Sequence, residues 1–140
     1  MNAFRYLALI LGSLVAVPVL AYENLIGEYT GKIIDVVGYN SKVGDPCGVM
    51  VGKSDMYGGS LIFEIRNAEK ILIEILNVQK ALEQNSNTVK MSTPGTPGKP
   101  AEAVVIKRGS DGAMQSLKLM FKAGRRGHDR AVNCGDLLKT

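Results

Sequence analysis

The sequence has no tryptophan, a single histidine and only two cysteines in 140 residues. A zinc site takes several histidine or cysteine ligands, and a hydrolytic triad joins a histidine to a nucleophile and an orienting acid. His128 is followed by Asp129, but neighbours in an extended chain point apart, and no serine stands in a nucleophile-elbow pattern. We therefore expect no catalytic residue, no metal site and no cofactor, with a hydrolase as the weaker alternative.

Aromatic residues are also few, at 6% of the chain, and none lies among the arginines near the C-terminus. Stacking of bases on aromatic rings supplies much of the affinity for single-stranded nucleic acid, so nucleic acid is not an expected partner. The formal net charge is +4, and residues 99–140 hold nine basic and four acidic residues, against seven and nine in residues 22–98. This basic end favours an anionic surface as a partner, such as acidic polysaccharide, lipid phosphate or an acidic protein patch.

Long apolar runs are absent except for one, from Tyr6 to Ala21, which follows Arg5 and is interrupted by Pro18. Its 16 residues fall short of the roughly 20 that a spanning helix needs, and no lysine or arginine follows in residues 22–24. These features predict a signal peptide over residues 1–21, cleaved after Ala21. Residues 22–140 suffice for a single domain without a transmembrane segment, in a secreted or periplasmic protein.

The two cysteines, Cys47 and Cys134, both lie in the expected mature part. An even number of cysteines in an exported chain favours a disulfide. A redox-active pair would have the close Cys-x-x-Cys spacing, which this chain lacks. The sequence therefore predicts a structural Cys47–Cys134 disulfide that joins an early strand to the last one.

Period-two alternation dominates the mature chain, and residues 61–67 are echoed ten positions later by residues 71–77. The pattern predicts a β-hairpin in which Leu61, Phe63 and Ile65 share the inner face with Ile71, Ile73 and Ile75. Glu64 and Glu74 then lie together on the solvated face. Residues 68–84 also form an amphipathic helical pattern, so a helix at about 68–84 in an α+β fold is the alternative, and a helical turn near 79–84 is a further option.

The same alternation predicts seven or eight strands in all, over residues 25–34, 47–51, 61–67, 71–77, 87–91, 102–107, 114–121 and 131–138. We expect an all-β, antiparallel meander that forms a small barrel or sandwich, because closure removes exposed edges. Gly27 and Gly31 in the first strand indicate sharp coiling. The expected inner face carries no charge and either fills the interior or leaves a pocket for a small apolar ligand: Tyr29, Ile33, Val49, Val51, Phe63, Ile65, Ile73, Ile75, Leu117, Leu119 and Phe121.

This plan resembles lipocalin-like meanders, and Gly27-Glu28-Tyr29 is similar to the Gly-x-Trp with which they begin. The resemblance covers three residues and has tyrosine in place of tryptophan. It implies a barrel, and no ligand is carried over from it.

Two segments are candidate interaction elements. The first is a Pro-Gly-rich recognition loop, whose low entropy would help a partner bind, made of Thr93, Pro94, Gly95, Thr96, Pro97, Gly98 and Lys99. The second is a basic hairpin whose exposed Arg125, Arg126 and Arg130 are candidate anion-binding residues. The sequence thus predicts an exported, non-enzymatic binding domain for a small apolar ligand or an anionic surface. An inhibitor or protein-interaction module that uses the 93–100 loop is the alternative.

Overall fold

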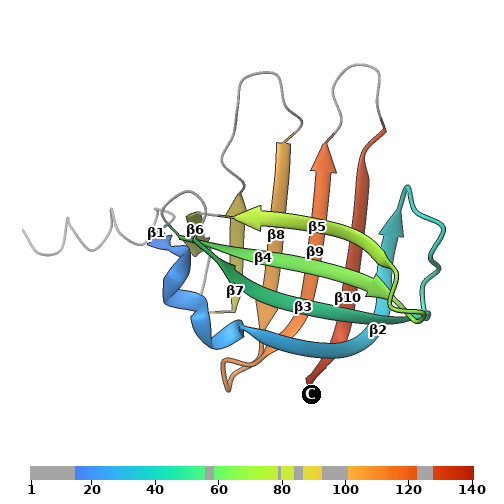
Figure 1. Ribbon diagram of the computed structural model, residues 1–140, viewed down its shortest axis with the longest axis horizontal. Helices are drawn as coiled ribbons and strands as arrows, with labels where there is room; N and C mark the ends of the chain where they lie inside the picture. The colour runs from blue at the N-terminus through green and yellow to red at the C-terminus, as the bar shows by residue number, and fades with distance from the viewer. Residues whose placement is uncertain (1–14, 56–58, 79, 84–86, 93–100, 123–127) are drawn as a thin grey trace, which may run out of the picture.

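A computed structural model describes residues 15–55, 59–78, 80–83, 87–92, 101–122 and 128–140 (Figure 1). These residues form one antiparallel sheet and a short 3-10 helix, η1 (Val19–Leu25). The strands are β1 (Val15–Pro18), β2 (Gly27–Val37), β3 (Pro46–Ser54), β4 (Ser60–Asn67), β5 (Leu72–Val78), β6 (Lys80–Glu83), β7 (Thr88–Ser92), β8 (Ala101–Arg108), β9 (Met114–Lys122) and β10 (Arg130–Lys139).

The strand order is β1-β6-β7-β8-β9-β10-β2-β3-β4-β5, so most neighbours in the sheet are also neighbours in the sequence. Only residue 79 separates β5, at one end of this order, from β6 near the other end. The meander therefore curls on itself, with β10 pairing against β2. The predicted all-β antiparallel meander is confirmed, and each of the eight predicted ranges overlaps a strand.

Two expectations about secondary structure were wrong. The alternative helix at 68–84 is absent from the described residues of that range, which form the turn at residues 68–71 and strands β5 and β6. The helical turn near 79–84 is instead strand β6, because Lys80–Glu83 pairs with both β7 and β1. Strand β1 lies inside the predicted signal peptide, whose cleavage remains a prediction.

The sheet folds into two layers that cross at a steep angle, with the first part of β2 and strands β3–β5 in front of β7–β10 (Figure 1). Side chains from the two inner faces fill the space between the layers. Nine of the eleven predicted inner-face residues are buried, and Leu61, Leu76, Val78, Val89, Met91, Val104, Ile106 and Val132 join them. Burial of these apolar side chains is the main stabilising contribution to such a fold.

Strand β2 passes from one layer to the other at a site where only glycine fits. The pairing of β2 with β10 shifts register twice, around Ile34 and between Gly135 and Leu138. A Cβ atom on Gly31 would lie 2.2 Å from the backbone oxygen of Gly135 and 2.9 Å from Leu137. The coiling predicted from glycine is therefore confirmed at Gly31, where the two backbones approach closely.

The predicted disulfide between Cys47 and Cys134 is present. It connects β3 to β10, the two strands that flank β2, with a Cα–Cα distance of 6.1 Å. Both cysteines are buried on the inner face. The bridge therefore fixes the closure of the sheet on both sides of the β2 bend.

The predicted facing of β5 was wrong. Ile65 is opposite Glu74, but Arg66 is opposite Leu72, so Ile73 is an extra residue in β5. Such a bulge shifts the alternation by one position. Ile73 still packs against the core, whereas Ile71 and Ile75 are 62% and 41% exposed. Consequently Glu74 leaves the solvated face predicted for it and lies on the face of Ile65, away from Glu64.

Candidate functional site

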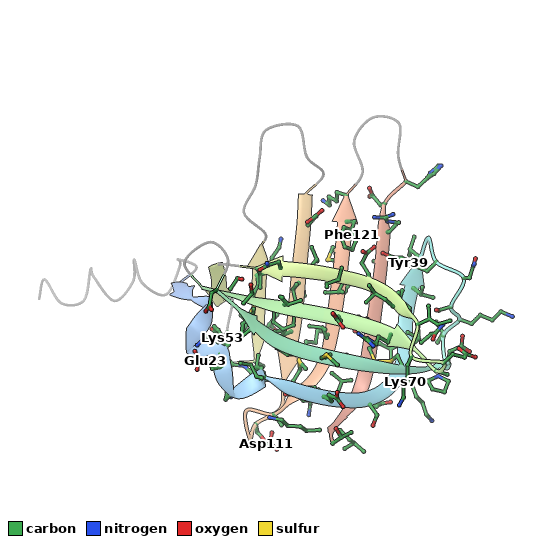
Figure 2. All side chains as sticks on the ribbon, viewed as in Figure 1. Glu23, Tyr39, Lys53, Lys70, Asp111 and Phe121 are labelled. Atoms are coloured by element: carbon green, nitrogen blue, oxygen red, sulfur yellow. A yellow bond between two sulfur atoms is a disulfide. The ribbon has the colours of Figure 1, made fainter. Side chains whose placement is uncertain are left out.

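A cluster of polar and aromatic side chains lies at one rim of the curled sheet, and we call Tyr39, Glu74, Phe121 and Arg130 the rim cluster. Phe121 is opposite Arg130 in the pairing of β9 with β10, so their side chains share the inner face. Tyr39 follows β2, and Glu74 comes from β5 in the front layer. Figure 2 shows Tyr39 and Phe121 at the same end of the molecule.

Arg130 is held by aromatic rings and a carboxylate. Its guanidinium carbon lies 5.1 Å from the centroid of Phe121 and 5.9 Å from that of Tyr39. One of its terminal nitrogens is 3.6 Å from Glu74 Oε2. The Arg130 side chain is nevertheless 48% exposed. Ring contacts restrict a guanidinium without using its N–H groups, so Arg130 keeps donors that face solvent.

Tyr39 determines how Glu74 is oriented. The Tyr39 hydroxyl donates a 2.7 Å hydrogen bond to Glu74 Oε2, the oxygen that also faces Arg130. The Glu74 side chain is only 19% exposed. Burial and the bond to Glu74 raise the pKa of Tyr39 well above its ordinary value of 10.0, against a smaller opposite effect of Arg130. The hydroxyl is therefore a fixed donor. Glu74 Oε2 is shared between Tyr39 and Arg130, and Oε1 accepts a 3.3 Å hydrogen bond from the backbone N–H of Ile75.

This arrangement gives a testable pH dependence. A tyrosine whose pKa is raised by folding contributes stability that is complete below its unfolded pKa, near 10, and is lost as the pH rises through the folded value. We expect the free energy of unfolding to fall more steeply between about pH 10 and about pH 11 in the wild type than in Tyr39→Phe. Urea unfolding at several pH values measures this difference. The raised pKa of Tyr29 is common to both proteins, and parallel curves would contradict the role assigned to Tyr39.

The strand ends that flank the two predicted interaction segments are described at this rim. Arg125, Arg126 and residues 93–100 lie outside the described residues. The strand ends that they connect are described, however: Ala101 is opposite Lys122, and Phe121 is opposite Arg130. Glu102, opposite Phe121, adds a second carboxylate to the same row. Lys122 and Ala101, which lie next to these segments in the sequence, are therefore paired one residue from Phe121.

Of the three arginines predicted to bind anions, only Arg130 is described. It is the first residue of β10 and is exposed, and its guanidinium lies over Phe121, a residue of the core. His128 and Asp129 are exposed. Within the described ranges, no three His, Cys, Asp or Glu residues gather as metal ligands would. Sequence reasoning missed Tyr39 and Glu74, whose separation of 35 residues left no local signal.

The inner face of the described strands is filled by side chains, several with no exposed surface. Two hollows that described residues line are open to solvent. One lies over β2, β3 and β4, and the other lies between η1, the β8–β9 turn and the end of β10. In the part of the chain that the structure describes, no helix has the length and apolar character needed to cross a bilayer.

Comparison with known proteins adds no family assignment: neither a protein-family model nor a curated protein matches this chain.

Proposed function

We propose that this chain is an exported, non-enzymatic binding domain that engages an anionic group of its partner through Arg130 at the rim cluster. The observation that supports this most directly is the geometry of Arg130, which two rings and Glu74 hold in place while about half of its side chain stays exposed. A restrained cation loses little side-chain entropy when an anion binds. Its planar fork suits a carboxylate or a phosphate.

The proposed location outside the cytoplasm follows from chemistry and from the leader-like N-terminus. A disulfide and the absence of a membrane-spanning helix among the described residues are compatible with an extracellular or periplasmic protein. Disulfides persist in such oxidising compartments. Export through a cleaved signal peptide over residues 1–21 completes this proposal.

A protein partner is the second candidate, because the strand ends on both sides of the 93–100 segment lie at the same rim. Ser92 is opposite Ala103, and Ala101 is opposite Lys122, one residue from Phe121. A Pro-Gly-rich segment attached here would approach a partner together with Arg130. An inhibitor or interaction module using residues 93–100 would therefore share the rim cluster with an acidic partner surface.

The test is binding to anionic phospholipid vesicles and to heparin, at low and at moderate salt. We expect Arg130→Ala to weaken binding about tenfold, as loss of one charge-assisted contact predicts. Salt should weaken the wild-type interaction, because exposed charges are screened over about 8 Å at physiological ionic strength.

Lys53→Ala is the matched control, since it also removes one partly exposed cation that forms an ion pair, with Glu23, and Figure 2 shows Lys53 away from Tyr39 and Phe121. It should bind like the wild type. Arg125→Ala combined with Arg126→Ala tests the predicted contribution of these two residues. Equal binding by the Arg130 variant and the wild type, with an unchanged far-ultraviolet spectrum, would contradict the proposal.

A further inference from the structure

A second site is indicated on the outer face of the front layer, on the opposite side of the sheet from the rim cluster. There, a hollow of about 320 Å³ crosses β2, β3 and β4 and reaches the turn after β4. We call it the outer hollow. It is centred on Gly48, which is opposite Thr30 on one side and Arg66 on the other. The missing side chain in the middle of this row leaves the space.

The fold does not require glycine at position 48. Its φ is not in the left-handed region, and an added Cβ would meet only the backbone oxygen of Tyr29, at an ordinary 3.7 Å. Gly31, by contrast, has no room for a Cβ. Glycine weakens a strand interior and often marks a place where a ligand approaches the backbone closely. The absence of a side chain at Gly48 is therefore better explained by the hollow that it leaves than by the packing of the sheet.

Lys70, which also lines the outer hollow, is a second residue that the fold does not favour. It ends a tight turn in which its N–H donates to Asn67, and Asn67 N–H donates to Ile71. Its φ of 64° lies in the left-handed region, where hairpins of this kind usually place glycine. A lysine in this strained position presents a charge that the turn itself does not need. Figure 2 shows Lys70 at the turn end of the front layer.

The outer hollow has a positive charge at one end and a negative charge at the other. Arg66 is engaged by Glu64, with its Nη2 and Nε donating to Oε2 at 2.8 and 3.2 Å. Lys70 is exposed and makes no ion pair with another described residue. Glu28 lies at the end of the hollow away from Lys70. It pairs with Met50, whereas the turn that holds Lys70 begins after Asn67, which pairs with Cys47, three residues earlier in β3. Apolar surface between them comes from Pro46, Met50 and Ala68.

We infer that the outer hollow binds a small organic anion with an apolar body, such as an aromatic or aliphatic carboxylate or sulfonate. The body lies over Gly48 and Met50, and the anionic group lies against Lys70, away from Glu28. The volume is at the lower end of the range for small-molecule sites. This site is independent of the rim cluster, and either one can exist without the other.

The experiment is a fluorescence titration of the full chain with 1-anilinonaphthalene-8-sulfonate and with N-phenyl-1-naphthylamine, its neutral counterpart without the sulfonate. Lys70→Gly should weaken the affinity for the sulfonate at least tenfold and leave that for the neutral probe unchanged. The melting temperature should be equal or higher, because glycine relieves the left-handed strain. Gly48→Val should weaken both probes by filling the hollow, and it should also leave the sheet folded, since valine suits a strand.

Gly52→Val is the matched control for Gly48→Val. Gly52 lies on the same strand, has open space for a Cβ and does not line the outer hollow. It should bind both probes like the wild type, and so should Arg130→Ala, which separates this site from the rim. Unchanged sulfonate affinity in folded Lys70→Gly or Gly48→Val would overturn the proposal. An equal loss of both probes in Lys70→Gly would overturn the assignment of Lys70 to the anion.

Discussion

Replacing Cys47 or Cys134 with serine is expected to lower the free energy of unfolding by about 2–5 kcal/mol. The bridge spans a sequence separation of 87 residues, and long loops lose the most entropy in the unfolded state when they are closed. A single substitution also leaves a polar hydroxyl in a buried apolar site, because both cysteines are at most 4% exposed. Both effects act in the same direction.

Guanidinium unfolding of the two single variants and of the double alanine variant measures the loss. The double variant separates the two causes, since it removes the bridge without burying a hydroxyl. Unfolding the wild type in the presence of a reductant should reproduce most of the destabilisation of the double alanine variant. A midpoint unchanged by reduction, or two thiols that react with an alkylating reagent in the folded protein, would show that the bridge does not stabilise this fold.

Gly31→Ala should be the second most destabilising change. We expect it to lower the free energy of unfolding by about 3 kcal/mol or more, the upper end of what overpacking a protein core costs. A methyl group there would lie 2.2 Å from the Gly135 backbone oxygen. A flexible side chain could move away, whereas this oxygen belongs to the backbone next to Cys134, which pairs with β9 and is held by the disulfide. Relief therefore requires that β2 and β10 separate at the bend.

Urea unfolding of Gly31→Ala beside Gly52→Ala tests this explanation. The Gly52 Cβ position has nothing within 4 Å, so that variant should be neutral or slightly stabilised, as alanine reduces the entropy of the unfolded chain. If both variants lost similar amounts of stability, the replacement of glycine itself, and not the close approach of the two backbones, would explain the destabilisation.

The strands could be predicted because period-two alternation survives in most of them. Leu61, Phe63 and Ile65 alternate without interruption and are all buried. The facing of β5 could not be predicted from the same pattern, since one extra residue at Ile73 reverses the alternation after it. The left-handed residue Lys70 belongs to the turn before β5 and does not mark the extra residue at Ile73.

The rim cluster was only partly accessible from the sequence. Arg130 stood out as part of a basic run, and that context indicated a solvated turn. Its contacts with Tyr39 and Glu74 depend on the crossing of two layers, which no spacing in the sequence encodes. The outer hollow was missed for a related reason: Gly48 and Lys70 become neighbours only after β3 and β4 pair.

The pairing of β2 with β10 also bears on how fast this chain reaches its native state. Among the described strands from β2 onward, every other pairing joins consecutive strands, and each can form with a short loop. The seam between β2 and β10 brings Tyr29 against Lys139 and closes a loop of nearly the whole domain. Loop-closure entropy rises with length, and long-range pairing slows folding. We therefore expect formation of the seam to be the slow step of folding. A Cys47–Cys134 disulfide that is already formed would shorten the loop to be closed and speed this step.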